Sequence, residues 1–224
     1  MQRQNLDPPI EVEARGTTTA SVIWLHGLGA DGHDFEPLVP ELSAAGVAGV
    51  RYVFPRAPRQ PVTINGGMVM RAWYDIVDQD IGRHVDAQGI RSSGEILAAL
   101  IARESERGIP SERIVLAGFS QGGAIALHTG VRHSRPLAGI LALSCYLPLQ
   151  EDAATEANAD HRSMPIFMAH GTQDPVIPLA YSERSRAFLT SLGYVVETHT
   201  YPMPHAVCGE EVRDIADWLR RVLG

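Results

Sequence analysis

Short apolar runs alternate with segments of helical spacing along most of this 224-residue chain. Runs such as residues 20–25 and 50–54 are apolar nearly throughout and predict buried strands. Residues 10–14 instead alternate apolar and polar positions, which predicts an antiparallel edge strand. Four further apolar runs predict strands over residues 114–117, 137–143, 165–169 and 194–201.

The segments between these runs predict helices. Residues 35–42 have helical spacing, although Pro37 and Pro40 leave the start of that helix open. Helices are also predicted after residue 120 and over residues 86–107 and 180–192. The last helix is the clearest, because Val212, Ile215, Ala216, Leu219 and Val222 share a face. This alternation predicts one α/β domain over residues 1–224, with a mostly parallel central sheet and helices on both faces.

Two segments depart from the pattern. Residues 55–84 contain three prolines and Gly66-Gly67, and predict only a small hairpin around Asn65-Gly66. A connection of this length is often an active-site loop or lid, although a surface excursion without a role is the alternative. Residues 151–160, rich in Ala, Glu and Asp, predict a solvated loop.

Composition narrows the classes of partner. A formal charge of −7 with no Lys/Arg run argues against nucleic acid. The longest mostly apolar stretch, residues 137–149, is shorter than the ~20 residues of a membrane span, so no stable membrane insertion is expected. Residues 1–8 lack the apolar core of a signal peptide, and two cysteines are too few for a disulfide framework. These features predict a cytoplasmic, reduced protein.

The most informative motif is Gly118-Phe119-Ser120-Gln121-Gly122, which lies between a predicted strand and a predicted helix. A serine at such a turn is typical of a nucleophile elbow, where the hydroxyl is held above the sheet edge. Glycines two positions either side leave room for the turn. The helix N-terminus would also favour a developing negative charge.

A serine nucleophile needs a base, and the base needs an orienting acid. Asp174 follows the strand ending at residue 169, and His205 follows the last strand, in the Ser-Asp-His order of α/β-hydrolases. Parallel sheets bind ligands beyond the carboxyl ends of their strands, so we expect Ser120, Asp174 and His205 to converge there. His170 is more typical of a residue packed at a strand end.

Acyl transfer also needs donors for the tetrahedral oxyanion. The backbone N–H of Gln121, directly after the serine, is one candidate. The glycine-rich loop of residues 26–32 is predicted to supply the other from Leu28, with an ordinary turn as the alternative. The nine histidines show no ligand spacing, so no metal or cofactor is expected.

These motifs together resemble the carboxylesterase, lysophospholipase and acyl-protein thioesterase family of small α/β-hydrolases. The resemblance implies the α/β-hydrolase fold, a catalytic triad of Ser120, Asp174 and His205, and oxyanion donors from Leu28 and Gln121. It also places the segment around residues 60–79 beside an acyl-binding groove. The matching stretches include residues 25–29, 56–58, 73–75, 118–123, 143–144, 146–148 and 170–178, and His205.

We therefore expect a serine hydrolase that cleaves small-molecule esters of short to medium acyl chains, and also acyl thioesters. A lysophospholipase, a peptidase or lactone hydrolase, and a non-catalytic binding protein are the alternatives. The chain is too short for a large cap domain, and an open apolar cleft would permit a homodimer. Cys145 is interpreted as a packing residue, and Cys208 as a thiol near His205. The predicted acyl-pocket residues, each with core packing as its alternative, are Met68, Met70, Trp73, Leu147 and Ile177.

Overall fold

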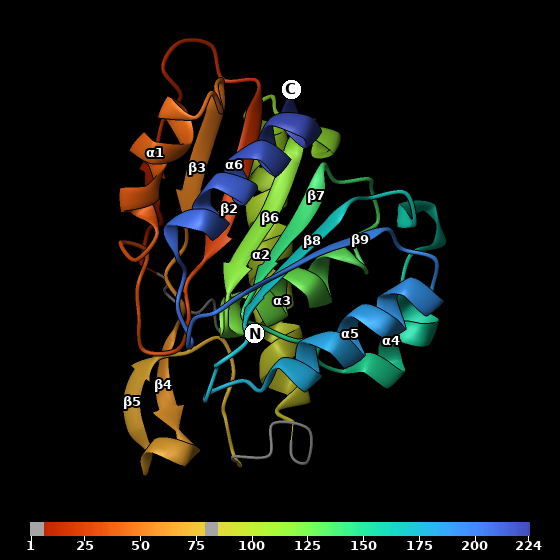
Figure 1. The fold of residues 1–224 in the computed structure, drawn as a ribbon. Helices are drawn as coiled ribbons and strands as arrows, with labels where there is room; N and C mark the ends of the chain where they lie inside the picture. The colour runs from red at the N-terminus through yellow and green to blue at the C-terminus, as the bar shows by residue number, and fades with distance from the viewer. Residues whose placement is uncertain (1–6, 79–84) are drawn as a thin grey trace.

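Across residues 7–78 and 85–224, which the computed structural model describes, a central sheet has the strand order β1-β3-β2-β6-β7-β8-β9 (Figure 1). Strand β1 runs antiparallel to β3, and the other neighbours are parallel. The predicted edge strand and mostly parallel sheet are both confirmed. The strands are β1 (Ile10–Val12), β2 (Ala20–Leu25), β3 (Val50–Phe54), β6 (Ile114–Phe119), β7 (Gly139–Leu143), β8 (Ile166–Gly171) and β9 (Val196–Tyr201).

Helices cover both faces of this sheet and divide the core into two clusters. On β2, Ile23 and Leu25 pack with the helices of one face, whereas Val22 and Trp24 pack with those of the other. The uninterrupted apolar run of β2 follows from this burial on both sides. Helices α2 (Ala87–Glu106), α3 (Gln121–Gly130) and α5 (Leu179–Ser191) cover the first face, and α1 (Val39–Ala44) and α6 (Gly209–Leu223) the second. Within the described residues, each helix is too short or too polar to cross a bilayer.

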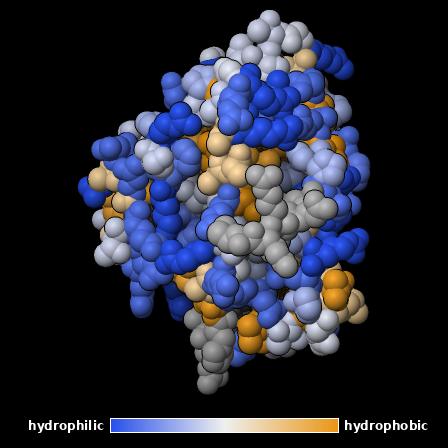
Figure 2. Space-filling model, turned by 180° about the vertical axis from the view of Figure 1, so that it is seen from behind, coloured by the Kyte–Doolittle hydropathy of each residue, from blue (hydrophilic) through white to orange (hydrophobic). Residues whose placement is uncertain are grey.

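The predicted hairpin in the long connection is confirmed as a separate two-stranded sheet of β4 (Arg59–Val62) and β5 (Met68–Arg71). Gly66 has a φ of 67°, a left-handed conformation that glycine adopts without strain. Met68 and Val69 are 63% and 57% exposed. They add to the hydrophobic colour at the edge of the hairpin, lower right in Figure 2. Residues 79–84 of this connection, and residues 1–6, lie outside the described ranges.

The prediction of a solvated loop over residues 151–160 was wrong for residues 151–156, which belong to helix α4 (Gln150–Glu156). Ala153 is buried against the core, while Asp152 and Glu156 both pair with Arg91 of α2, at 2.7 and 2.8 Å. The ion pairs link this short helix to a distant segment. Its composition alone gave no sign of that contact.

Helix α6 buries an unpaired carboxyl group. Glu211 is fully buried, and neither of its carboxylate oxygens accepts a hydrogen bond from the described residues. Burial disfavours the charged form and raises the pKa of Glu211 to about 8. The unfolded chain releases this proton near pH 4.5 and the folded chain near pH 8. Folding stability should therefore fall as the pH rises between these values.

Replacing Glu211 with glutamine should remove this pH dependence. Between about pH 5 and pH 8, the wild type should lose unfolding free energy relative to the Glu211→Gln variant, by up to about 1.4 kcal/mol per pH unit. Urea unfolding at both pH values measures the difference. Glu210→Gln, at the exposed neighbouring position, is the control and should follow the wild type. Parallel pH curves for Glu211→Gln and the wild type would contradict the assignment.

Candidate active site

The predicted elbow lies between β6, which ends at Phe119, and α3, which begins at Gln121. Ser120 has φ 56° and ψ −122°, a conformation that is costly for a residue with a side chain. Two backbone hydrogen bonds hold it. The Ser120 N–H donates to the Leu143 carbonyl at 2.9 Å, and its carbonyl accepts from the Ala124 N–H at 3.0 Å. The surrounding sheet and helix thus maintain the strain at the serine.

Close backbone contacts explain the glycines around Ser120. A Cβ on Gly118 would lie 2.3 Å from the carbonyl carbon of Gly122. One on Gly122 would lie 2.4 Å from the carbonyl oxygen of Leu25, at the end of β2. Both distances are far below van der Waals contact, and both involve backbone atoms that cannot rotate away. The turn can therefore form only with glycine at these positions.

Replacing Gly122 with alanine should destabilise the fold and disturb the elbow. Overpacking of this kind costs about 1–3 kcal/mol, and backbone contacts place this site at the upper end. Thermal or urea unfolding, together with activity per folded molecule, measures both effects. Gly209→Ala is the control, because a Cβ there meets no atom within 4 Å. Equal stability of the two variants would refute the packing argument.

The structure brings Asp174 and His205 together across 31 residues. The Nδ1–H of His205 donates to Oδ2 of Asp174 at 2.6 Å. The other oxygen, Oδ1, accepts from the backbone N–H groups of Val176 and Ile177 at 2.8 and 2.9 Å. Both carboxylate oxygens of this buried side chain are thus satisfied. The arrangement fixes the imidazole with its Nε2 free to accept a proton.

His205 also lies beside the elbow. Its ring packs on the ring of Phe119, the residue before Ser120, with 4.6 Å between centroids. Ser120 is 8% exposed and the His205 side chain 15% exposed. Both residues are therefore largely enclosed, but each keeps some surface open to solvent. Among the described residues, no hydrogen bond joins the Ser120 hydroxyl to His205. Such contacts are often long in free enzymes and tighten when substrate binds.

His170 also lies close to Asp174, but its ring already makes a hydrogen bond to another residue. Its Nε2–H donates to the Ile177 carbonyl at 2.8 Å, and the same nitrogen is 3.4 Å from Asp174 Oδ2. Burial lowers the pKa of His170, which keeps the ring neutral. Its place at the end of β8 agrees with the packing role inferred from the sequence.

The two predicted oxyanion donors have free N–H groups. Neither the Leu28 N–H nor the Gln121 N–H donates a hydrogen bond within residues 7–78 and 85–224. The loop that carries Leu28 lies against Ser120, since a Cβ on Gly27 would be 3.4 Å from the Cβ of Ser120. His26 holds this loop in place: its Nδ1–H donates to the Gly27 carbonyl at 2.7 Å, and its Nε2 accepts from the Ala57 N–H at 3.0 Å.

The predicted acyl-pocket residues fall into two groups. On β5, Met68 is exposed, and Met70 places its sulfur beside the Leu28 loop, 3.8 Å from where a Cβ on Gly29 would lie. Trp73, Leu147 and Ile177 are at most 5% exposed and contribute mainly to packing. Leu147 also borders a cavity of about 620 Å³ between the segment after β7 and helix α5.

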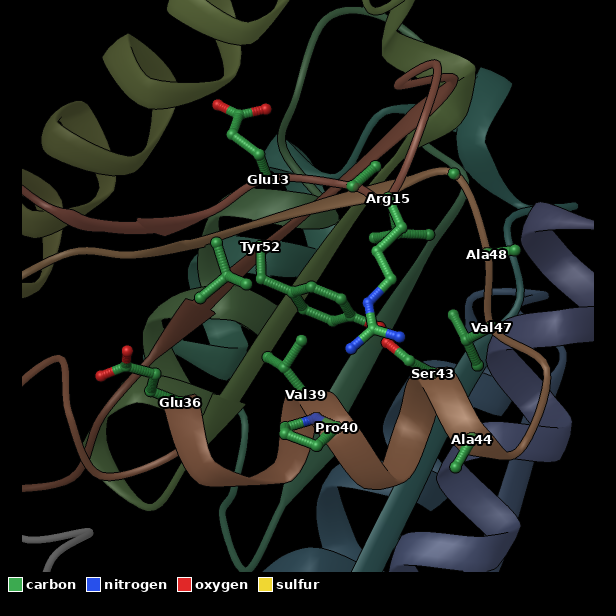
Figure 3. A pocket seen from close by; sticks show the side chains of 14 residues that line it. Glu13, Arg15, Glu36, Val39, Pro40, Ser43, Ala44, Val47, Ala48 and Tyr52 are labelled. Atoms are coloured by element: carbon green, nitrogen blue, oxygen red, sulfur yellow. The ribbon is translucent and has the colours of Figure 1, made fainter.

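Another cavity, of about 570 Å³, lies apart from these residues, between α1 and the strands β1 and β3 (Figure 3). Arg15, Ser43 and Tyr52 point toward its middle from three separate segments. None of the predicted site residues lines it, and it contains no histidine beside a nucleophile. The predicted catalytic residues therefore lie apart from this cavity.

Sequence reasoning missed the contacts made by two side chains near the elbow. The Gln121 side chain binds the backbone at Trp73 and Tyr74, and the Trp73 indole binds the carbonyl of His26. Both residues were noted for other roles, as a backbone donor and as an acyl-pocket wall. No periodic pattern predicts such contacts, because they join residues 47 or 48 positions apart in the chain.

Known proteins are similar to this one over nearly the whole chain. Residues 9–223 match the phospholipase/carboxylesterase family. An acyl-protein thioesterase 1 from Mycosarcoma maydis is 41% identical over 220 residues, which cover 92% of each chain. The crystal structure of Arabidopsis thaliana SOBER1 has a TM-score of 0.87 at 28% identity, covering 92% of this chain and 100% of that one. That of Zea mays acyl-protein thioesterase 2 has a TM-score of 0.86 at 27% identity, covering 96% and 99%.

These similarities confirm the fold predicted from the motifs. The solved relatives superpose on the sheet and helices together, so the resemblance concerns the whole architecture and not the elbow alone. The sequence match likewise extends from before β1 to the end of α6. The chain belongs to the phospholipase/carboxylesterase family of α/β-hydrolases.

Proposed function

We propose that this protein is a serine hydrolase that cleaves carboxylic esters and acyl thioesters, with Ser120, His205 and Asp174 as its catalytic triad. The observation that carries the proposal is the 2.6 Å hydrogen bond between His205 and Asp174, next to a serine held in a strained elbow. A serine hydroxyl is a weak nucleophile until a base accepts its proton. The pair supplies that base in a fixed orientation.

The reaction follows from this geometry in two halves. In the first half, Nε2 of His205 takes the hydroxyl proton of Ser120 as the serine oxygen attacks the acyl carbon. The tetrahedral intermediate expels the alcohol or thiol, which receives that proton from His205, and leaves an acyl-enzyme. In the second half, His205 deprotonates a water molecule, which attacks the acyl-enzyme. The acid is released, and the proton returns to Ser120.

The oxyanion of each intermediate is assigned to the N–H groups of Leu28 and Gln121. Neither N–H donates a hydrogen bond within the described chain, which supports this role. A donor already paired within the protein would be unavailable to the oxyanion. Gln121 is also the first residue of α3, where the helix dipole favours negative charge.

Short- to medium-chain acyl groups are the proposed substrates. The exposed Met68 and the half-buried Met70 present apolar surface on the hairpin, and Met70 lies beside the Leu28 loop. Acyl-protein thioesters are included because relatives named as acyl-protein thioesterases align with nearly the whole chain. Lysophospholipids remain a second candidate, in keeping with the family's name.

A substrate panel tests the proposal directly. Purified protein is assayed with acyl esters and acyl thioesters of increasing chain length, a lysophospholipid and peptide amides. We expect turnover of the esters and thioesters and little turnover of amides, whose leaving groups are poorer. A preference for amides would assign a peptidase instead. A wild type that neither turns over these substrates nor reacts with a fluorophosphonate probe would identify a binding protein.

A further inference from the structure

The two assigned oxyanion donors come from separate elements, the loop after β2 for Leu28 and the start of α3 for Gln121. To serve one oxyanion, they must be held within about 0.5 Å of their working positions. One short segment, residues 71–74, contacts both elements, and we call it the bracket segment. It comprises the last residue of β5 and the three residues that follow.

The bracket segment holds the Leu28 loop on both sides of its donor. Before Leu28, the carbonyl of His26 accepts from the indole Nε1–H of Trp73 at 2.8 Å. After it, the Gly29 N–H donates to the Arg71 carbonyl at 2.9 Å. His26 and Trp73 are each 1% exposed, so water cannot replace their hydrogen bond if it is lost. These two bonds fix the peptide groups on either side of the one that carries the Leu28 N–H, and so restrict the direction of that N–H.

The same segment also binds the residue that carries the second donor. The side-chain Oε1 of Gln121 accepts from the Trp73 N–H at 3.0 Å, and its Nε2–H donates to the Tyr74 carbonyl at 2.8 Å. The buried carboxamide therefore pairs with the bracket segment as a neighbouring peptide strand would. A hydrogen bond from the Ser93 hydroxyl to the Trp73 carbonyl anchors the bracket segment to α2.

We propose that the bracket segment sets the distance between the two oxyanion donors, with Trp73 and the side chain of Gln121 as positioning residues. The inference rests on the proposed function, because the distance matters only if Leu28 and Gln121 bind an oxyanion. Neither side chain touches the substrate in this role. Both act by placing backbone N–H groups, whose displacement by about 1 Å can cost on the order of 100-fold in rate.

The first test replaces Trp73 with phenylalanine, which keeps an aromatic ring but leaves the His26 carbonyl without its donor. We expect kcat to fall on the order of 10- to 100-fold with little change in KM. A trifluoromethyl ketone forms an oxyanion adduct with the serine, and its affinity should fall by the same factor as kcat/KM. Rates are expressed per fluorophosphonate-reactive site, so partial unfolding does not imitate the effect.

Trp218→Phe is the matched control, because Trp218 is also 1% exposed but packs in the other core cluster, on α6. It should lower the melting temperature and leave kcat and inhibitor affinity per active site unchanged.

Gln121→Met is the second test: it keeps the backbone N–H and removes both side-chain bonds. It should reproduce the loss in kcat. Combining it with Trp73→Phe should cost less than the product of the single effects, since both release the same segment.

Two outcomes would overturn the inference while leaving the proposed function intact. In the first, the Trp73→Phe and Gln121→Met variants keep wild-type kcat and inhibitor affinity per active site. In the second, KM rises or chain-length preference shifts at constant kcat, which would make Trp73 a wall of the acyl pocket. Failure of the proposed function itself is recognised separately, by a wild type without ester turnover or probe labelling.

Discussion

Replacing Ser120 with alanine should reduce ester turnover by about 10⁶-fold, the loss seen when a hydrolase of this type loses its nucleophile. The acyl-enzyme can no longer form, and only water attack assisted by the remaining groups persists. The fold should survive, because the two hydrogen bonds that hold residue 120 involve its backbone alone. Alanine has no hydroxyl, so fluorophosphonate labelling should also disappear.

The measurement compares kcat on a short-chain ester with probe labelling, using protein free of wild-type carry-over. Ser182→Ala is the control, because Ser182 is also a buried serine but lies on α5, away from the elbow. It should keep wild-type turnover and labelling. Retention of even a tenth of wild-type activity by Ser120→Ala would place the nucleophile elsewhere.

Replacing Asp174 with asparagine should lower kcat on the order of 10⁴-fold without unfolding the protein. The asparagine carbonyl can still accept from the N–H groups of Val176 and Ile177, which preserves the loop. Its amide N–H₂ would then face Nδ1 of His205, where a hydrogen-bond acceptor is needed. The imidazole would be forced into the tautomer with Nε2 protonated, which cannot accept the proton of Ser120.

Circular dichroism and thermal unfolding confirm that the Asp174→Asn variant is folded, and steady-state kinetics give its kcat. Asp214→Asn is the matched control: Asp214 accepts a 2.7 Å hydrogen bond from Tyr201 and lies 3.4 Å from the His199 ring, but outside the site. Its kcat should equal that of the wild type. Near-normal turnover by Asp174→Asn would assign the orienting role to another residue.

Several parts of the fold and site could be predicted because their causes are local. The strands at residues 20–25 and 50–54 were predicted with their observed bounds, since burial on both faces requires uninterrupted apolar runs. The elbow could be predicted for a similar reason. Its glycines are required by contacts within the turn and with the end of β2, the neighbouring strand in the sheet. The error at residues 150–156 has the opposite cause. A polar, alanine-rich composition suits both a loop and a short helix, and distant contacts with Arg91 accompany the helix.

Outside helix α4, the pattern of strands and helices could be predicted from the amino-acid sequence, as could the strained serine and the candidates for acid and base. These depend on periodicity, on backbone sterics and on the order of residues along a parallel sheet. The hydrogen bonds of the Asp174 carboxylate could be known only from the tertiary structure, and so could the link that Trp73 and Gln121 make between the Leu28 loop and the start of α3. Such contacts depend on directions and distances between segments far apart in the chain, which no local pattern of residues specifies.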